Sequence, residues 1–198
     1  MKCLELTTII LLNIILSLLF SFLAPILPLE IRRRHISQTY IGFILGVMCL
    51  GYIVCLYFVT ELAYSTLGRR GTSLLGFFIM SVALLLYGLA YFVPDQHKSL
   101  FKFCSLFTRF FEGVGLGIAS PATVALIAKL FPSELGRATS ARFLGSYSGI
   151  TIGVVVGALV REVVGYFGVF LIFSITVGVS SFLIFVFDED SSPDLRYE

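Results

Sequence analysis

Residues 108–142, TRFFEGVGLGIASPATVALIAKLFPSELGRATSAR, place an arginine and a glutamate inside an apolar segment. Arg109 and Glu112 stand near its start, three glycines follow at alternate positions, and the polar turn FPSELGR separates it from the next apolar run. A charged side chain at the centre of a membrane helix costs about 2.5–3.5 kcal/mol on insertion scales, so ionisable residues there are functional candidates. The stretch therefore predicts a membrane-spanning helix that carries a site.

The composition of the whole chain is typical of a membrane protein. Of 198 residues, 58% are hydrophobic and 13% are charged, with a mean hydropathy of +0.99, whereas soluble domains carry about 25% charged residues. A net charge of +2 without a basic stripe argues against nucleic acid as a partner. The four cysteines are scattered, so we expect no metal site and no disulfide framework. No nucleotide loop or nucleophile–base set indicates a cofactor or an enzyme.

Six apolar segments are long enough to cross a bilayer, which takes about 20 residues each. We expect helices at about residues 6–29, 40–62, 72–93, 100–131, 138–160 and 166–187, followed by an acidic polar tail at 188–198 that would begin a central loop. The second and fifth segments both contain several glycines, so the six helices divide into two three-helix repeats, an arrangement common in transporters. The predicted fold class is an all-α, polytopic membrane protein. Basic residues are shared almost equally between the two sides, so they do not set the orientation.

Four motifs, in order along the whole chain, resemble those of the major facilitator superfamily, whose transporters have twelve helices in two halves. They are APILP at 24–28 with IG at 41–42, LGRRG at 67–71, RFFEGVG at 109–115, and FP at 131–132 followed by RA at 137–138. The segments ALIAKLFP and GVVVGALVREVVGYFG look most similar to the vesicular amine and drug-antiporter branch. The resemblance implies half of a twelve-helix facilitator fold, the N-terminal half, with both termini cytoplasmic.

Two motifs depart from the family pattern. Ser65 and Thr66 stand where the loop between the second and third helices usually has an acidic and a basic residue. Val154 follows Gly153 where the antiporter signature has a proline. These departures leave the family's charge relay incomplete and weaken a specific prediction of proton antiport.

The resemblance also implies a role for Arg109, and Glu112, three residues further on, shares one helical face with it. They would face a water-filled cavity and bind a charged substrate or carry a proton; the alternative is a structural ion pair. Asn13, Ser17 and Ser21 recur every four residues and form a polar stripe on the first helix. This stripe would either line the substrate pathway or hydrogen-bond to a neighbouring helix.

The glycines indicate close helix packing. Gly113, Gly115 and Gly117 would let a neighbouring helix approach or let the helix flex near Pro121. The fifth segment repeats glycine every four residues, which gives a smooth packing groove, at Gly145, Gly149, Gly153 and Gly157. The resemblance places this helix at the interface between the two halves, so we expect the groove to receive a helix from outside this chain.

Gly68 is expected to close the tight loop between the second and third helices by adopting a positive φ angle. Arg69 and Arg70 would then anchor that loop at the lipid headgroups or take part in gating.

The sequence thus predicts transmembrane transport of a small organic solute, with proton coupling as a further hypothesis. The protein would be a multi-pass component of the plasma membrane or of an intracellular vesicle membrane, in contact with the lipid bilayer. A second six-helix half would come from the same, longer chain or from a homodimer. The alternative is a non-transporting six-helix scaffold or regulatory subunit.

Overall fold

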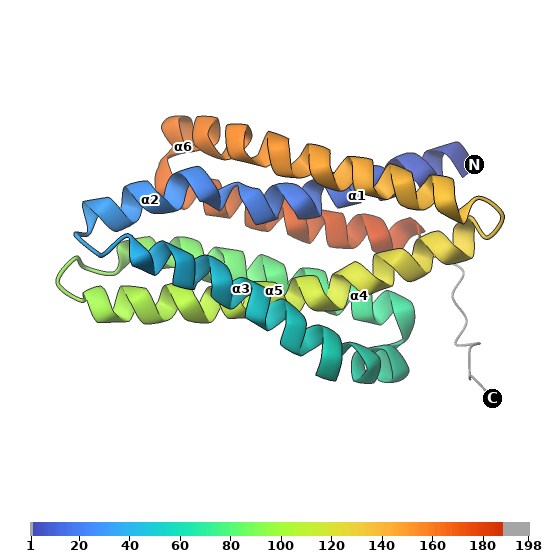
Figure 1. The fold of residues 1–198 in the computed structure, drawn as a ribbon, viewed down its shortest axis with the longest axis horizontal. Helices are drawn as coiled ribbons and strands as arrows, with labels where there is room; N and C mark the ends of the chain where they lie inside the picture. Colours follow the sequence, from blue (N-terminus) through green and yellow to red (C-terminus); the bar gives the residue numbers. More distant parts are fainter. Residues whose placement is uncertain (1, 188–198) are drawn as a thin grey trace.

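Long helices lie side by side along one axis in the computed structural model, which describes residues 2–187 (Figure 1). The elements are α1 (Lys2–Ser21), α2 (Leu23–Arg33), α3 (Thr39–Phe58), α4 (Thr60–Leu89), the short 3₁₀ helix η1 (Ala90–Phe92), α5 (Lys98–Leu130) and α6 (Leu135–Phe187). The described part of the chain contains no strand, which confirms the all-α prediction. The tail predicted at 188–198 lies outside the described residues.

Two glycines reverse the direction of the chain within elements α4 and α6. Gly68 has a φ of 66° and Gly165 a φ of 73°, values that a residue with a Cβ rarely adopts. Figure 1 shows α6 doubling back, so that its two runs are antiparallel. The side chains of Arg69 and Arg70 lie outside the described residues.

The first membrane pass is longer than expected and consists of two helices. Pro25 has no N–H to donate to the carbonyl of Ser21, and its ring opposes that carbonyl, so α1 ends at Ser21 and α2 starts two residues later. We expected the helix to end near residue 29, but α2 continues to Arg33. The reason is that Glu30 is buried and paired within this last turn rather than exposed in a loop.

The glycine groove of α6 is filled by α1. A Cβ added at Gly145 would lie 3.0 Å from the carbonyl oxygen of Ile10, and the same contact recurs one turn at a time along both helices. The four pairs are Gly145 with Ile10, Gly149 with Ile14, Gly153 with Leu18, and Gly157 with Phe22. The expectation that this groove receives a helix from outside the chain is therefore corrected: its partner is the first helix of the same chain.

The three alternate glycines of α5 face two different neighbours. Gly113 and Gly117 lie against the backbone of α3, where Cβ atoms would collide with the carbonyl of Met48 and approach that of Tyr52. Gly115 faces α4, where a Cβ would lie 2.7 Å from the carbonyl oxygen of Gly76. Helix α5 is thereby held between α3 and α4.

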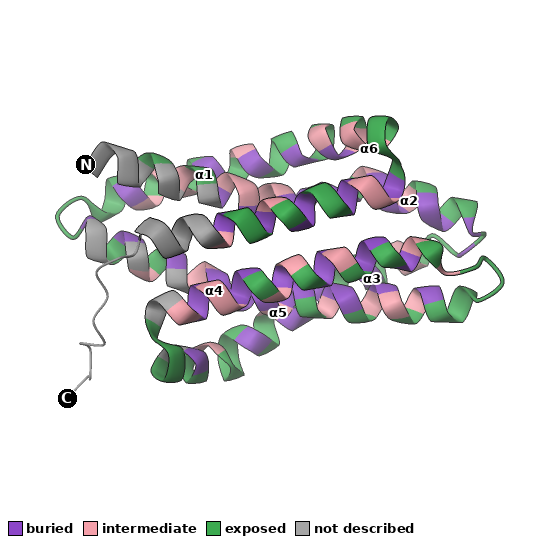
Figure 2. Ribbon diagram, turned by 180° about the vertical axis from the view of Figure 1, so that it is seen from behind, coloured by how far each residue is buried: buried purple, intermediate pink, exposed green. Residues whose placement is uncertain are grey.

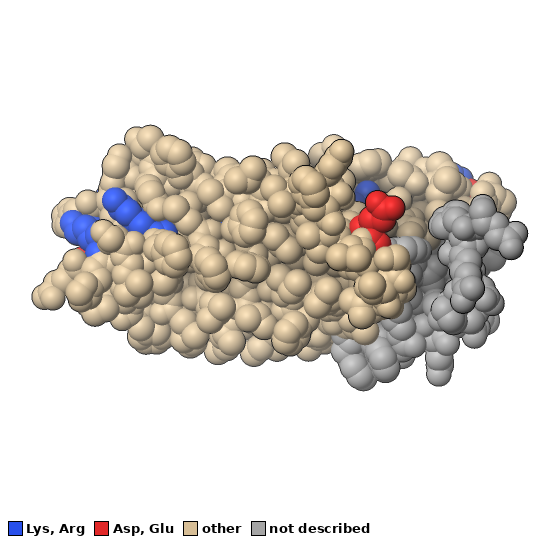
Figure 3. Space-filling view, turned by 90° about the horizontal axis from the view of Figure 1, so that it is seen from below, with Lys and Arg blue, Asp and Glu red and all other residues tan. Residues whose placement is uncertain are grey.

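The outside of the bundle is apolar along its middle. Figure 2 shows exposed and buried residues alternating along the runs, and the exposed set includes many large hydrophobic side chains such as Phe43, Ile53, Leu144 and Val155. On the face in Figure 3, charged side chains occur towards the two ends and a broad uncharged belt separates them. Such a belt matches the hydrocarbon layer of a membrane.

Four described segments are long and apolar enough to cross a membrane. They are Asn13–Arg33, Thr39–Phe58, Gly71–Phe92 and Leu135–Ser181. The last spans 47 residues and contains the reversal at Gly165, so it supplies two passes. The protein is an integral, multi-pass membrane protein.

A single glycine-to-alanine substitution, which adds one methyl group, tests the contact between α1 and α6. In Gly153→Ala, the new Cβ would collide with the Ser21 hydroxyl and lie 2.6 Å from the Leu18 carbonyl oxygen. Overpacking of this kind costs about 1–3 kcal/mol, so we expect a lower thermal unfolding midpoint, followed by circular dichroism in detergent. Gly46→Ala is the matched control, because a Cβ there meets nothing within 4 Å and alanine favours the helix by about 0.5–1 kcal/mol. Equal midpoints for the two variants would contradict the proposed packing.

Candidate functional site

Arg109 and Glu112 form an ion pair in the interior of the bundle. The Nη1 atom of Arg109 lies 3.0 Å from Oε2 of Glu112, and both side chains are 0% exposed. Both residues come from the middle of α5, one turn apart, as their spacing in the sequence predicts. Among the described residues, the ion pair of Glu30 and Arg34 is the other one whose two side chains are both buried.

Three helices enclose this pair. The Nη1 atom of Arg109 donates to the sulfur of Met48 in α3 at 3.5 Å, and its Cζ atom lies 5.0 Å from the ring centre of Tyr87 in α4. The ring face attracts the guanidinium by a cation–π interaction. Gly113 allows this enclosure, because the backbone of Met48 occupies the place where a side chain would stand.

Several polar atoms around the pair have no hydrogen-bond partner. Among the described residues these are Nε and Nη2 of Arg109 and Oε1 of Glu112. The hydroxyl of Tyr87 interacts with those of Ser105 and Tyr166, and Tyr87 is also an electrostatic neighbour of Arg109 and Glu112, so the five residues make up one cluster from α4, α5 and α6. Each buried polar group without a partner costs about 1–3 kcal/mol. A polar or charged group that enters the cluster would therefore form hydrogen bonds that these atoms now lack, and the carboxylate could also exchange a proton.

The sequence analysis missed a second buried arginine, Arg34, which directly follows α2. Its Nε atom donates to Oε1 of Glu30 at 2.7 Å, and both side chains are 1% exposed. Its Nη atoms donate to the carbonyls of Tyr91 and Val93 at 2.8 Å, and its Cζ atom lies 4.1 Å from the ring centre of Phe101. Arg34 is fully engaged and joins α2, the segment after α4, and α5. The four-residue spacing of Glu30 and Arg34 was the only signal in the sequence.

The polar stripe of α1 faces α6. Ser17 lies beside Gly149, Ser21 lies beside Gly153, and the Ser21 hydroxyl donates to the carbonyl of Leu18 at 3.3 Å. Asn13 is 2% exposed and its Oδ1 accepts a hydrogen bond from Nε of Arg142 at 3.1 Å. The stripe therefore takes part in the helix contact.

An apolar hollow of about 220 Å³ lies on the outer surface between α4 and α5. Its lining is Phe78, Ile79, Val82, Ala83, Leu86, Phe107, Thr108 and Phe111. Neither Arg109 nor Glu112 lines it, so this hollow is separate from the buried cluster. Within the described residues, no group of three or more His, Cys, Asp or Glu side chains could hold a metal ion.

Comparison with known proteins gives one family and several relatives. The family model described as Major Facilitator Superfamily matches residues 9–197. The chain is 26% identical over 148 residues to the MFS-type transporter SLC18B1 of Mus musculus, covering 74% of this chain and 31% of the relative. It is 29% identical over 163 residues to a putative inorganic phosphate cotransporter of Drosophila ananassae, covering 76% and 31%.

A third relative is the probable anion transporter 4, chloroplastic, of Arabidopsis thaliana, which is 26% identical over 170 residues, covering 85% of this chain and 30% of that protein. The chain therefore spans about a third of the length of the curated relatives it matches.

The contacts of Arg34 predict that it is a structural residue. In Arg34→Gln, the buried Glu30 would lose its close partner and keep only the half-exposed Arg33, whose Nη1 lies 3.7 Å from Oε2 of Glu30. Removal of one partner from a buried pair costs roughly 3–5 kcal/mol. We expect a large drop in the thermal unfolding midpoint and in the yield of monodisperse protein. Arg32→Gln is the control, because Arg32 is exposed on the same turn. Equal stability of the two variants would show that the Arg34 contacts contribute little.

Proposed function

We propose, since this chain belongs to the Major Facilitator Superfamily, that it forms all or part of a transporter for a small organic solute. In this proposal the buried cluster around Arg109 and Glu112 contacts the transported molecule. The observation that carries the proposal is the combination of full burial with unmet hydrogen-bonding capacity at these two side chains. A purely structural pair would be expected to resemble Arg34, whose donors are engaged.

The two charges give the cluster a way to bind and release. The guanidinium of Arg109 presents a planar set of donors that suits a carboxylate or phosphate, and the carboxylate of Glu112 suits an ammonium group. A charged solute would compete for one partner of the ion pair and engage the atoms that now lack a hydrogen bond. Binding would then depend on both residues, whichever sign the solute carries.

Proton coupling is a finer part of the proposal. Protonation of Glu112 would remove its attraction for Arg109 and free the guanidinium for an anionic solute. Loss of the proton would restore the ion pair and expel that solute. The buried position supports this role, because a proton is the smallest group that can neutralise an enclosed carboxylate.

We further propose that transport needs a second six-helix half. The relatives are about three times as long as the matched region, and alternating access moves one half against the other. The second half would be another part of a longer chain or a second copy of this one.

One observation favours the alternative of a non-transporting scaffold. At the loop before Gly68, the hydroxyl groups of Ser65 and Thr66 donate to the carbonyl of Leu62 at 3.0 and 2.8 Å. These hydroxyl groups form hydrogen bonds within their own helix, at positions where the family pattern has the charged residues of a relay. A protein that no longer switches between two states would not need that relay.

Uptake into proteoliposomes that contain the full chain tests the transport proposal. The probes are radiolabelled inorganic phosphate, glutamate and a primary amine. We expect the wild type to take up at least one probe, and an imposed pH gradient to accelerate this uptake. In Arg109→Lys the uptake rate should fall about tenfold or more, because an ammonium cannot form the same paired contacts. In Glu112→Gln the pH gradient should no longer accelerate uptake.

The exposed pair Glu134–Arg137 supplies the matched controls, since it has the same three-residue spacing and an Nη1–Oε2 distance of 3.2 Å, with side chains 58% and 86% exposed. Glu134→Gln and Arg137→Lys should transport like the wild type. A folded, monodisperse wild type that takes up none of the probes would favour the scaffold. Unchanged uptake in Arg109→Lys and Glu112→Gln would assign the buried pair to structure alone.

A further inference from the structure

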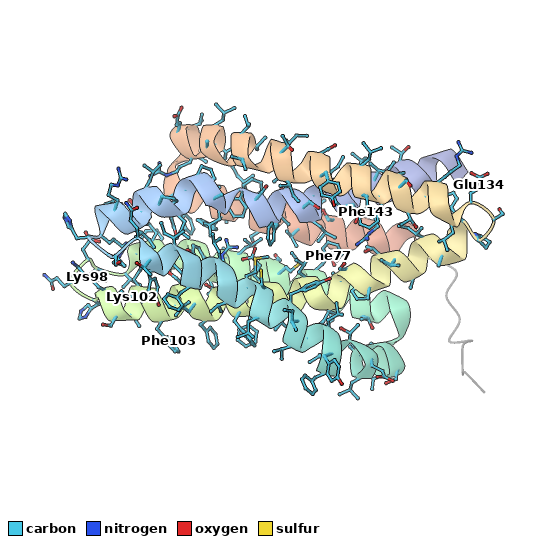
Figure 4. All side chains as sticks on the ribbon, in the orientation of Figure 1. Phe77, Lys98, Lys102, Phe103, Glu134 and Phe143 are labelled. Carbon is cyan, nitrogen blue, oxygen red and sulfur yellow. The ribbon has the colours of Figure 1, made fainter. Side chains whose placement is uncertain are left out.

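Arg142 lies at a junction of three helices. It stands about two turns past Leu135, the first residue of α6, and its side chain is partly buried. Its Nε atom donates to Oδ1 of Asn13 in α1 at 3.1 Å, and its Nη2 atom donates to the hydroxyl oxygen of Ser120 in α5 at 3.2 Å. The ring of Phe143, labelled on the first run of α6 in Figure 4, lies 5.7 Å from the Cζ atom of Arg142.

The partly buried guanidinium of Arg142 differs in its partners from the two buried arginines. Arg34 has the carboxylates of Glu30 and Asp95, and Arg109 has that of Glu112. The partners of Arg142 are an amide oxygen, a hydroxyl and an aromatic ring, and no described carboxylate lies within ion-pair distance of it. Among the described residues, the junction of α1, α5 and α6 therefore carries one positive charge without a counter-charge.

Such a charge has chemical consequences inside a membrane protein. An arginine side chain does not lose its proton in proteins, and a charged group within a membrane segment needs a counter-ion, a polar partner or contact with water. Asn13 and Ser120 hold two of the N–H groups and so fix the plane of the guanidinium. Its Nη1 atom makes no hydrogen bond with the described residues. A planar, fixed and partly accessible guanidinium is suited to paired hydrogen bonds with a carboxylate or phosphate.

We propose that Arg142, with Asn13 and Ser120, is an anion-binding site that takes a carboxylate or phosphate group. The group belongs either to a small soluble anion or to the headgroup of an anionic lipid. This site goes beyond the proposed transport function and does not depend on Arg109 and Glu112. Its failure is distinguishable from failure of the transport proposal, because binding is measured here without transport.

Thermal unfolding in nanodiscs tests the site. The full chain is placed in nanodiscs of phosphatidylcholine, and inorganic phosphate is titrated against chloride at constant ionic strength. We expect phosphate to raise the unfolding midpoint of the wild type in a saturable way, because a ligand that binds the folded state stabilises it. Arg142→Gln should lose this shift, and Arg142→Lys should need about tenfold more phosphate. Arg137→Gln is the control, because Arg137 is an exposed arginine near the start of the same helix.

A second arm separates the two sources of anion. Nanodiscs of phosphatidylcholine and phosphatidic acid in equal parts replace the neutral ones. If a lipid headgroup occupies the site, phosphatidic acid raises the wild-type midpoint above that of Arg142→Gln, and free phosphate adds nothing. Either source supports the site.

The proposal is overturned if neither phosphate nor phosphatidic acid shifts the wild type more than Arg142→Gln. Should Arg142→Gln fail to fold, Ser120→Ala keeps the cation and removes one of its hydrogen-bond partners. Responses to phosphate and to phosphatidic acid that are identical in Ser120→Ala, Arg142→Lys and the wild type would also overturn it.

Discussion

The close approach of glycines to the backbone of neighbouring helices is the contact on which the rest of this structure depends. In lipid, helices gain little from hydrophobic burial and associate through close packing and hydrogen bonds. The first run of α6 presents four glycines in register to the carbonyls of α1. The glycines of α5 do the same towards α3 and α4. These contacts hold the runs so close that the side chains of Arg109 and Glu112 have no exposed surface.

Because the helices pack so closely, the partners of each arginine inside the bundle indicate its role. Arg34 is surrounded by two carboxylates, two backbone carbonyls and an aromatic ring, so its positive charge is paired within the protein. Arg109 has one carboxylate oxygen, a sulfur atom and a ring, and two of its three nitrogen atoms lack a partner. The partners of Arg142 among the described residues are neutral. The three residues are chemically identical, and their surroundings separate a structural role from two proposed binding roles.

The sequence predicted the elements that rest on short spacings and missed those that rest on distant partners. Family membership, confirmed by the family match over residues 9–197, was visible in motifs such as RFFEGVG. The three-residue spacing of Arg109 and Glu112 predicted their shared face. The four-residue glycine repeat predicted a groove in α6, but spacing carries no information about the occupant, so α1 was not identified. The role of Arg34 was missed because two of its partners are backbone carbonyls 57 and 59 positions away, and the sequence does not indicate which carbonyl a side chain contacts.

The central claim is that the enclosed pair on α5 meets water at some stage of a transport cycle. The most direct test places a single cysteine at position 112 or at position 78, in a chain whose native cysteines are replaced by serine, and measures modification by a charged, water-soluble thiol reagent in native membranes. Phe78 is 64% exposed on the apolar outer surface, so Phe78→Cys should stay unmodified in lipid. The account predicts that Glu112→Cys reacts, because the cluster opens to water. If both cysteines are equally inert, the pair stays sealed and its role is structural.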